Sequence, residues 1–583
     1  MLIINVRRKN MKIFYVVHTF YPETYSGTER FVFNLSSQIG KMDNNVKVIT
    51  HSFYNDKTYD RKINNILIKN FVYKNVPIMA FKLCDELVDD LELENSKYVD
   101  AAVEILSEER PDIIHICHTI RAAFFIKAAK LLNIPYVVTL TDFFLVCPKI
   151  IYLNYNYEIC EGSRSGENCV NCHSKIKNKK IFSKRFKIAK DFLKDAKMVF
   201  TPSLALKKVF VNEFKNSIDI KVINHGIDFS KIRMNKKIYK DNDKITIGYI
   251  GALIYHKGVN LIINALSRIR NDNYNFKLYG TGEFEEILMI MAAKQGVKNI
   301  EFCGSFLGDN IWEMYKDIDI AIIPSIWNET YCFVVYEALA CNVPIIVSNV
   351  GALTENVKTG VNGLVFENKN VHQLSECIKL ILDKPSILNN FKDNICKMEI
   401  QSTEQEAKCY FEEYKKYIFS NDRDKKLVYN SNINNEKNPL SSLIMDSGEN
   451  FESNFIKKET YKILNEYDLK RDFLIFMIYK ICYLKEKFIH KKVNYVIWGA
   501  SNSGTITKML ISKYLPNFNL VCFVDKYKEG NLQNCIIRKT DDISKLNFQY
   551  ILVATSPGKQ EANKCLKELG LNLIEDYMYG YGV

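Results

Sequence analysis

One stretch of the 583-residue chain constrains its fold more than any other, and it runs from Ile320 to Ala340. The apolar run from Ile320 to Ile323 predicts a buried strand, the polar segment from Trp327 to Thr330 a loop, and Phe333 to Ala340 a helix. In an open parallel sheet such a loop leaves the carboxyl end of a strand, where the free N–H groups of the next helix attract phosphate. The stretch therefore predicts an α/β sheet that binds a diphosphate.

Two glutamates bracket this predicted phosphate site. Glu337 lies early in the helix, and because helical side chains lean towards the N-terminus, its carboxylate can accept both hydroxyls of a ribose. Taken alone, Glu337 also fits a solvated charge on a helix face. Glu329 stays in the loop and is expected to face outward, towards a sugar. Phe333 and Val334 open the helix and are predicted to donate their N–H groups to the diphosphate.

The spacing of these two glutamates carries a family resemblance. Glu329, seven residues and Glu337 resemble the donor-site signature of the retaining GT-B glycosyltransferases called glycosyltransferase family 4. The resemblance runs from Met11 to about Ser420. It implies an α/β protein with two Rossmann-like domains, which moves a sugar from a nucleotide diphosphate to an acceptor hydroxyl with retention and without a catalytic metal. It also implies a role in bacterial surface glycan or polysaccharide synthesis.

Two glycine-containing loops resemble donor-contacting loops of the family. The Ser-Gly-Thr-Glu sequence around Gly27 is similar to Gly-Gly-x-Glu, where the missing side chain lets backbone approach a phosphate, although an ordinary turn glycine explains it equally well. The segment from Gly251 to Gly258 is similar to Gly-Arg-Leu followed by Lys-Gly, which makes Lys257 the predicted cation for the diphosphate. Ala252 replaces the arginine, and a protonated His256 is the candidate substitute.

The predicted acceptor side carries a second group of polar residues. Thr139 to Asp142 is similar to the family's Thr-Leu-His-Asp, but Thr141 replaces the histidine. His118 follows another predicted strand and is the candidate replacement, although a lone histidine is more often structural. Glu329, His118 and Asp142 are therefore the predicted catalytic residues.

Four cysteines lie in a predicted insertion at residues 143–175. Sixteen cysteines in a chain of this length, with no visible export signal, are expected to be reduced thiols or metal ligands. A Cys-x-x-Cys pair can chelate a tetrahedral zinc ion, and two further thiolates can complete four ligands. The sequence leaves two alternatives, scattered reduced thiols or a structural zinc held by Cys147, Cys160, Cys169 and Cys172.

Another pair of acidic residues matches a metal motif that we reject. Asp317-Ile318-Asp319 fits the metal-binding Asp-x-Asp of other glycosyltransferase folds, but Asp319 opens a predicted buried strand at the end of the sheet opposite the ligand loop. Glu355 is a weaker candidate for the donor site.

The net charge of +13 favours an anionic partner. Nucleotide diphosphates and anionic lipid both fit, and no nucleic-acid module is visible in the sequence. Lys175 to Lys197 predicts a basic amphipathic helix, which either lies on anionic lipid or packs its apolar face into the core. The sequence shows no signal peptide and no membrane span, so we expect a cytoplasmic protein, with peripheral attachment to the inner membrane face as the alternative.

The residues beyond the resemblance predict a further module. Residues 420–450 resemble a polar linker, 451–490 a helical segment, and 491–583 a small Rossmann-like domain. Gly499, Gly504 and Asp525 are similar to a nucleotide loop and its ribose carboxylate, although Ser501 occupies the middle glycine position. The module either binds a dinucleotide here or serves a structural or pairing role.

The resulting organisation has an acceptor-side domain at 11–230 and a donor domain at 231–419. The expected partners are a nucleotide-sugar donor and a glycan or lipid-linked acceptor, and an oligomer is compatible with the sequence. Two other functions stay open. One is a non-catalytic scaffold that binds nucleotide or glycan in an assembly complex, and the other is a nicotinamide-dependent oxidoreductase activity of the C-terminal module.

Overall fold

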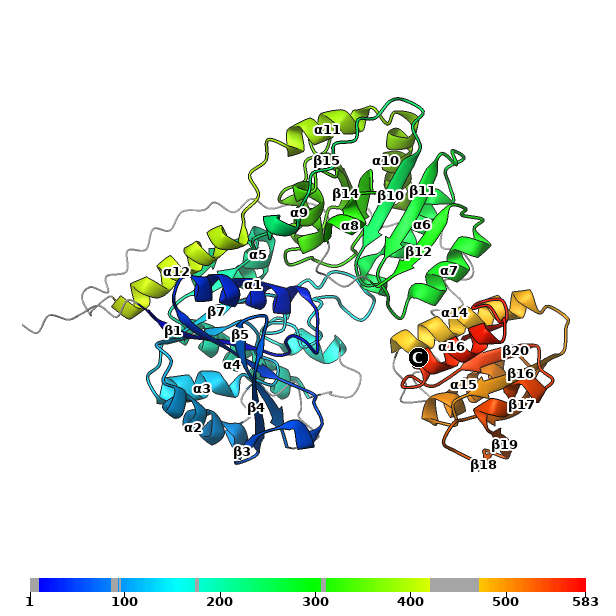
Figure 1. Cartoon of the computed structure of the whole chain (residues 1–583), viewed down its shortest axis with the longest axis horizontal. Helices are drawn as coiled ribbons and strands as arrows, with labels where there is room; N and C mark the ends of the chain where they lie inside the picture. The colour runs from blue at the N-terminus through cyan, green and yellow to red at the C-terminus, as the bar shows by residue number, and fades with distance from the viewer. Residues whose placement is uncertain (1–9, 85–92, 94–95, 173–177, 306–310, 420–470) are drawn as a thin grey trace, which may run out of the picture. The chain divides into compact units, whose positions relative to one another are not determined.

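The structure is a computed structural model that describes residues 10–84, 93, 96–172, 178–305, 311–419 and 471–583 (Figure 1). The predicted linker at 420–450 and the first part of the predicted helical segment, 451–470, lie outside these residues. The chain divides into two compact units: unit 1 holds residues 1–251, 256–280 and 299–425, and unit 2 holds 252–255, 281–298 and 426–583. Residues 281–298 thus group with the C-terminal residues and not with the rest of the predicted donor domain.

The first half of unit 1 is built on a mostly parallel sheet. Its described strands lie in the order β3 (Arg61–Ile63), β4 (Ile66–Tyr73), β5 (Val76–Leu83), β2 (Asn45–His51), β1 (Lys12–Val17), β6 (Ile113–Ile116), β7 (Tyr136–Thr139), β8 (Val199–Thr201) and β9 (Ile220–Val222). Only β3, β4 and β5 pair antiparallel among them. The carboxyl ends of β1, β6 and β7 therefore meet at one edge, where an α/β sheet places its ligands.

Helices cover this sheet. They are α1 (Gly27–Lys41), α2 (Val99–Glu109), α3 (Phe124–Leu131), α4 (Lys179–Asp195) and α5 (Leu204–Glu213). The predicted basic helix corresponds to α4, and its Phe182, Phe186 and Phe192 are buried. Of the two predicted fates for this helix, the structure shows the apolar face packed into the protein and lysines left at the surface.

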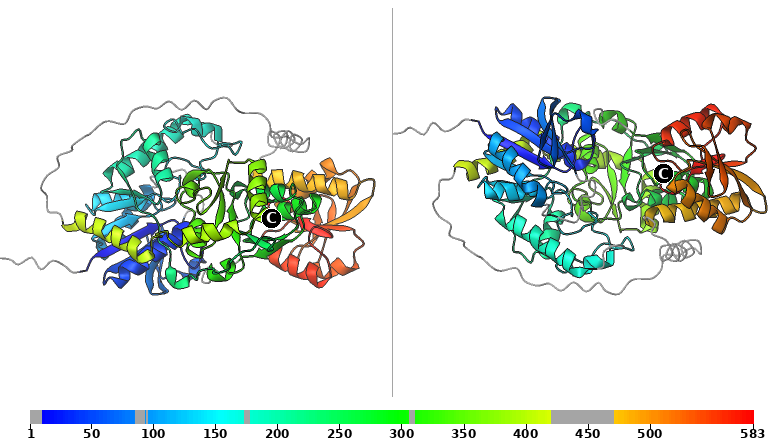
Figure 2. Two further views of the ribbon diagram at one scale, coloured as in Figure 1. Left: turned by 90° about the horizontal axis from the view of Figure 1, so that it is seen from above. Right: turned by 90° about the horizontal axis from the view of Figure 1, so that it is seen from below.

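The second half of unit 1 contains a fully parallel sheet. Its strands lie in the order β12 (Ile300–Gly304), β11 (Tyr274–Tyr279), β10 (Ile245–Ile250), β13 (Ile320–Ile323), β14 (Ile345–Ser348) and β15 (Gly363–Phe366). Its helices are α6 (Val259–Leu266), α8 (Ile311–Tyr315), α9 (Phe333–Ala340), α10 (Val371–Asp383), α11 (Ile387–Ile395) and α12 (Thr403–Phe419). The last of these crosses back to lie beside α1 of the first half (Figures 1 and 2).

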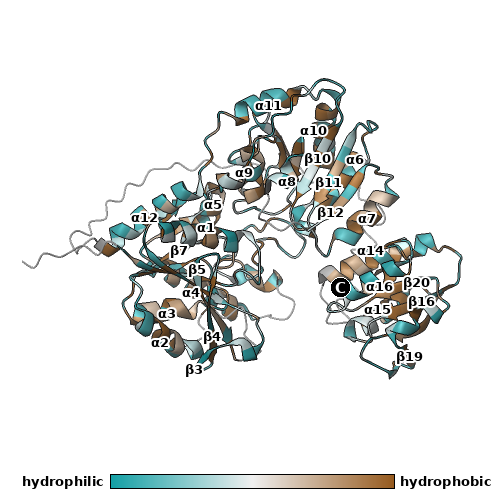
Figure 3. Ribbon diagram, viewed as in Figure 1, coloured by the Kyte–Doolittle hydropathy of each residue, from teal (hydrophilic) through white to brown (hydrophobic). Residues whose placement is uncertain are grey.

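Hydrophobic residues explain why β13 is central. All four of its residues, Ile320 to Ile323, are buried, as expected of a parallel strand covered on both faces. In Figure 3, α12 is largely hydrophilic along its visible length. The predicted strand, loop and helix from Ile320 to Ala340 are confirmed, with α9 beginning at Phe333.

Unit 2 has its own sheet and helices. The strands lie in the order β18 (Gly530–Leu532), β19 (Cys535–Arg538), β17 (Phe518–Val524), β16 (Val493–Trp498), β20 (Tyr550–Val553) and β21 (Tyr577–Tyr579), with helices α7 (Glu285–Lys294), α14 (Arg471–Lys487), α15 (Asn502–Tyr514) and α16 (Lys559–Glu568). Ile290 of α7 lies in the same core as Met477 and Ile481 of α14. A buried ion pair between Glu286 and Lys480 joins the same two helices. The apolar face of α14 is thus covered within unit 2.

None of the helices in the described ranges is long and apolar enough to cross a membrane.

Candidate active site

A cavity of about 470 Å³ lies between the two halves of unit 1. Its walls come from the carboxyl ends of β1, β6, β7 and β13 and from the first residues of α1 and α9. Seven of the predicted site residues line it: Gly27, His118, Asp142, Lys257, Glu329, Phe333 and Val334. The structure therefore brings the predicted donor and acceptor residues to one place.

A larger cavity, of about 1010 Å³, lies beside the connection between the halves. Phe229, Met234 and Met398 contribute apolar walls, and Glu399 and Lys408 are the charged residues that line it. Lys257 and the first residues of α9, Phe333 and Val334, line the smaller cavity and not this one, so the smaller cavity is the better candidate for phosphate chemistry.

The start of α9 shapes the donor side of the smaller cavity. Cys332 caps the helix with φ 65° and ψ 80°, a left-handed conformation that only few non-glycine residues adopt. This turn places Phe333 and Val334 against the cavity, and the N–H groups of a helix's first turn have no intrahelical acceptor. The helix dipole adds positive potential at the same point, which favours a bound anion.

Lys257 supplies a full positive charge beside that helix. Gly258 follows it with φ 72°, and a Cβ there would lie 2.0 Å from the Pro324 carbonyl oxygen, so only glycine allows the loop after β10 to meet the loop after β13. The Lys257 ammonium donates to Glu329 Oε1 over 2.7 Å. Burial opposes its charge, but attraction to Glu329 prevails and raises the lysine pKa.

Glu329 is buried, and the prediction that it faces outward is wrong. Its side chain is 5% exposed, and Oε1 also accepts hydrogen bonds from Ser325 Oγ at 2.6 Å and Trp327 Nε1 at 2.8 Å. Burial alone would raise the pKa of this carboxyl, but Lys257 and the two other donors lower it. The sequence pattern did not predict the inward orientation of the Glu329 side chain, because that orientation depends on the position of Lys257, 72 residues away in the chain.

His118, Asp142 and His18 line the opposite wall of the cavity. His118 Nε2 lies 2.7 Å from Asp142 Oδ2, and the Ile120 N–H donates to His118 Nδ1 over 3.2 Å. The Nδ1 is thus an acceptor, so Nε2 carries the proton and donates to Asp142. Burial would raise the Asp142 pKa, but His118 and the Phe144 N–H lower it. His118, the candidate replacement for the family's histidine, therefore contacts the aspartate of the Thr-Leu-Thr-Asp segment.

His18 is a cavity residue that the sequence reasoning missed. It follows β1, and its ring centroid lies 3.9 Å from that of His118. Its Nδ1 is buried and has no hydrogen-bond partner among the described residues. Burial and the neighbouring His118 hold its pKa well below the usual value, so the ring is neutral near pH 7. Its position at the carboxyl end of the first strand was the available signal.

Gly27 begins α1 at the edge of the cavity. A Cβ on Gly27 would lie 3.6 Å from the Phe333 ring, an ordinary contact, so the protein itself does not require glycine here. The neighbouring turn is fixed by Glu29, whose carboxylate accepts hydrogen bonds from Thr19 and Thr24 and forms a capping box with Ser26.

Glu337 lies one turn further along α9 and does not line the cavity. It is 3% exposed and forms an ion pair with Arg30 of α1. The solvated-charge alternative for Glu337 is therefore wrong, and Arg30 is a second residue, after His18, that the sequence reasoning missed.

Comparisons with known proteins find glycosyltransferase families and relatives for most of unit 1. Family models described as Glycosyltransferase Family 4 and Glycosyl transferases group 1 match residues 25–231 and 230–398. An uncharacterized glycosyltransferase of Methanocaldococcus jannaschii, MJ1607, is 31% identical over 215 residues, which are 34% of this chain and 55% of that protein. The chain spans about half the length of the curated relatives it matches.

Solved structures show the same architecture. Sucrose-phosphate synthase from Thermosynechococcus elongatus aligns with a TM-score of 0.53 at 14% identity, over 70% of this chain and 100% of that one. Anabaena HepE in complex with UDP and glucose aligns at 0.50 and 16% identity, over 69% and 99%. The fold of unit 1 is GT-B. The predicted fold class is confirmed, and the matches cover the part of the chain that forms this unit.

Within the GT-B unit, two further residues that the sequence suggested for the donor site, His256 and Glu355, do not line the cavity. Burial and Lys257 lower the pKa of His256 to about 4, so it is not the substitute cation that the sequence suggested. Glu355 accepts hydrogen bonds from the Leu204 and Ala205 N–H groups at the start of α5, over 3.2 and 2.7 Å. It caps a helix of the other half and does not line the cavity.

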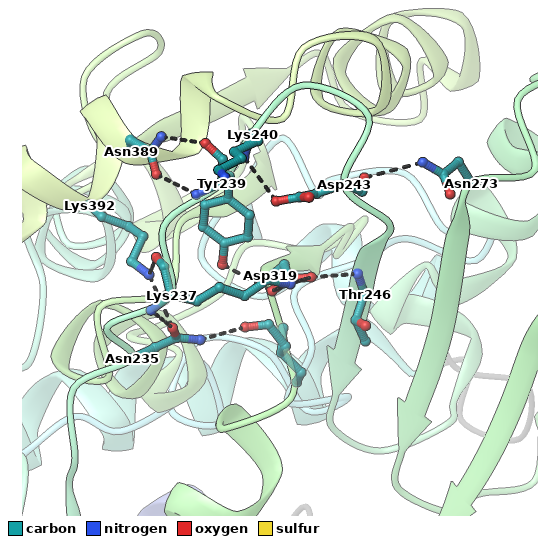
Figure 4. Close-up of polar contacts among 11 residues, drawn as sticks. Asn235, Lys237, Tyr239, Lys240, Asp243, Thr246, Asn273, Asp319, Asn389 and Lys392 are labelled. Atoms are coloured by element: carbon teal, nitrogen blue, oxygen red, sulfur yellow. Dashed lines mark hydrogen bonds and ion pairs between the residues drawn. The ribbon is translucent and has the colours of Figure 1, made fainter.

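Asp319 has a structural role in the GT-B unit. Both of its carboxylate oxygens lie 2.8 Å from Lys237 Nζ, and they also accept from the Tyr239 hydroxyl at 3.0 Å and the Thr246 N–H at 2.9 Å (Figure 4). These contacts tie the chain entering the second half to its sheet. They give Asp319 a structural role.

The four cysteines of the insertion are free thiols in the structure. Burial raises the pKa of Cys147 to about 11 and that of Cys169 to about 12. No group of three or more His, Cys, Asp or Glu side chains within the described ranges is placed to hold a metal ion, and His173 lies outside those ranges. The structure thus gives the predicted zinc site no support.

The glycine-rich loop of unit 2 is closed by backbone contacts. Asp525 Oδ2 accepts from the Ala500 N–H at 2.9 Å, and Oδ1 accepts from the Tyr527 and Lys528 N–H groups. A Cβ at Gly504 would lie 2.2 Å from the Gly499 carbonyl oxygen, so that glycine serves the packing of α15 on β16. Both oxygens of the predicted ribose carboxylate therefore already bind backbone.

Proposed function

We propose that the chain is a glycosyltransferase that moves a sugar from a nucleotide-diphosphate donor to an acceptor hydroxyl. One observation carries the proposal: Lys257 and the N-terminus of α9 converge on a cavity between two Rossmann-like halves. Such a site suits two linked phosphates, because it combines a mobile cation with fixed N–H donors. The two glycosyltransferase family models that match residues 25–398 support the same reaction class.

The donor side of the cavity stabilises the leaving group in this proposal. As the bond to the sugar breaks, negative charge grows on the diphosphate. Phe333 and Val334, whose N–H groups belong to the free first turn of α9, line the same cavity. Lys257 has three ammonium protons and can bind phosphate while it still touches Glu329. Electrostatic stabilisation of this kind strengthens when the cavity excludes water.

The sugar lies between Glu329 and the histidine wall in this proposal. The Ser325, Trp327 and Lys257 donors all bind Oε1 of Glu329, which leaves the lone pairs of Oε2 for a sugar hydroxyl. On the other wall Asp142 orients His118, and the neutral His18 offers an unpaired nitrogen to a hydroxyl of the sugar or acceptor. The halves of unit 1 thus divide donor and acceptor binding.

We extend the proposal to a retaining, metal-independent reaction in bacterial surface glycan synthesis, because the glutamate spacing resembles that of family 4. The acceptor would be a glycan or lipid-linked sugar. We also propose that the protein is cytoplasmic. The apolar face of α4 is buried, so contact with an anionic membrane would be electrostatic and would use the exposed lysines of that helix. Oligomerisation and the zinc ion stay predictions, which light scattering and elemental analysis test.

A donor panel tests the proposed reaction. Full-length protein is incubated with UDP-, ADP-, GDP- and dTDP-sugars, and release of the nucleoside diphosphate is measured against Lys257→Ala. We expect release from at least one donor by the wild type and much slower release by the variant. The absence of both binding and release for every donor would contradict the proposal.

A further inference from the structure

A largely buried ion pair beside the donor site joins the two halves of the GT-B unit. Arg30 lies on α1 of the first half, and Glu337 lies on α9 of the second, 307 residues later. Their side chains are 23% and 4% exposed. The Arg30 guanidinium carbon also lies 4.7 Å from the centroid of the Phe333 ring, the first residue of α9. The guanidinium thus covers the start of the donor helix from the opposite half.

The environment of Glu337 makes its charge depend on that contact. Tyr315, which is fully buried, donates to Glu337 Oε2 at 3.4 Å and to the Val334 carbonyl oxygen at 3.1 Å. A neutral hydroxyl does not balance a buried carboxylate, and removing the partner of a buried charge is strongly unfavourable. Burial opposes the charge of Arg30, but Glu337 outweighs it and raises the arginine pKa. Arg30 therefore stays a cation and faces the carboxyl group of Glu337.

The hydrogen-bonding capacity of Glu337 leaves room for a ligand. An ionised carboxylate offers about four lone-pair sites. Arg30 uses a site on Oε1 and Tyr315 one on Oε2, which leaves about two for the 2′ and 3′ hydroxyls of a ribose. Arginine is suited to this task because its planar guanidinium can hold a carboxylate in one orientation while it stacks on an aromatic ring.

We propose that Arg30 is a positioning residue for the donor ribose, which acts from the first half of the unit by holding Glu337 charged and oriented. This inference rests on the proposed function, in which a nucleotide occupies the cavity. It means that neither half alone forms the ribose site. Nucleotide binding and approach of the two halves are then one coupled event, because the same ion pair serves both.

The test measures discrimination between ribose and deoxyribose. UDP, ADP and GDP are each titrated against their 2′-deoxy analogues by calorimetry, into full-length wild type and into Arg30→Met, Arg30→Lys and Glu337→Gln. Loss of a hydrogen bond to a charged group is worth about a 10- to 100-fold change in affinity, so the wild type should prefer the ribose form by roughly that factor. We expect Arg30→Met to bring this preference close to one, as Glu337→Gln does, and Arg30→Lys to keep part of it.

Controls separate positioning from damage to the fold. Arg61→Met removes an exposed arginine that pairs with Glu104 and Glu108 in the same half, and it should leave the preference unchanged. In an Arg30→Met/Glu337→Gln double variant, which removes both buried charges, the preference should match that of Glu337→Gln alone. This variant, with Arg30→Lys, keeps the test open if Arg30→Met does not fold.

Two outcomes would overturn the inference. One is an unchanged ribose preference in Arg30→Met or, if that variant does not fold, in Arg30→Lys. The other is an equal loss of affinity for ribose and deoxyribose forms. If the wild type binds none of the nucleotides, the proposed function itself fails, which is a different result.

Discussion

The chain contains two strand–loop–helix units that look alike in sequence and differ in chemistry. In unit 1, β13 leads to α9, and Lys257 reaches the loop from a neighbouring strand and pairs with Glu329 beside a cavity. In unit 2, β16 leads through a glycine-rich loop to α15, and both carboxylate oxygens of Asp525 accept hydrogen bonds from backbone N–H groups. A glycine-rich loop and a nearby acidic residue are thus insufficient evidence for a nucleotide site. A binding site needs charges that converge on unfilled space.

The largest expected effect comes from removing the cation of the first loop. Lys257→Ala should lower kcat/KM about 10²–10³-fold, because a preorganised group that stabilises growing negative charge is lost and Glu329 is left buried without its partner. Initial rates of nucleotide release measure it. The matched control is Lys528→Ala, which removes a lysine that donates to the Ala500 carbonyl oxygen in the second loop. A loss of similar size in the control would break the comparison.

The two acidic residues provide the next test. Glu337→Gln should weaken nucleoside diphosphate binding about 10- to 100-fold, since a charge-assisted hydrogen bond to ribose is lost. Asp525→Asn should leave that affinity unchanged and instead lower the unfolding free energy of unit 2 by about 1–3 kcal/mol, because backbone donors lose their ionised acceptor. Calorimetric titration and denaturation of both variants measure the two quantities. Reversed results would assign the ribose site to the second loop.

The response to acid should also separate the two units. Burial lowers the pKa of His51 to about 4 and that of His115 to about 3 in unit 1, whereas the single histidine of unit 2, His490, is exposed. Below pH 6.5 these histidines bind protons in the unfolded chain but stay neutral in the folded protein. The unfolding free energy of unit 1 therefore falls as the pH drops. At pH 5 the loss is at most about 2 kcal/mol for each ring. Hydrogen exchange followed by mass spectrometry, which resolves the units, should show greater acid sensitivity in unit 1.

The smallest expected effect concerns the backbone at the two loops. Cys332 adopts φ 65° at the start of α9, so Cys332→Gly should relieve strain and change stability by no more than about 1 kcal/mol, with turnover retained. Gly499→Ala should act in the opposite direction, because its φ is 118° and a Cβ would lie 2.8 Å from the Ala554 carbonyl oxygen. Thermal denaturation compares the two variants. A large loss of turnover in Cys332→Gly would show that the thiol itself contributes to the site.

Much of the fold followed from apolar strands and helix periodicity. The fully apolar run at β13 and the helix α9 matched the structure at the predicted residues, because burial on both faces leaves little choice of boundary. The antiparallel hairpin of β4 and β5 was not predicted, since its strands mix buried and exposed residues around a short turn.

The candidate site was predictable only where one local motif defines it. Lys257, Phe333 and Val334 reach the cavity because each is fixed by the loop that contains it. The inward turn of Glu329 and the pairing of Glu337 with Arg30 depend on segments far apart in the chain. Such contacts are set by packing and leave no local pattern, which is why sequence reasoning placed one glutamate outside and missed the arginine.

We expect the donor nucleotide to bind in the cavity of unit 1 and not at the glycine-rich loop of unit 2. The most direct test maps where a bound nucleotide slows hydrogen exchange in the full-length chain. Hydrogen exchange is followed by mass spectrometry with and without a saturating nucleoside diphosphate from the panel that binds. The account predicts slower exchange at residues 255–262 and 325–340 and no change at 499–504. Protection confined to residues 499–504, with the first two segments unaffected, would contradict it.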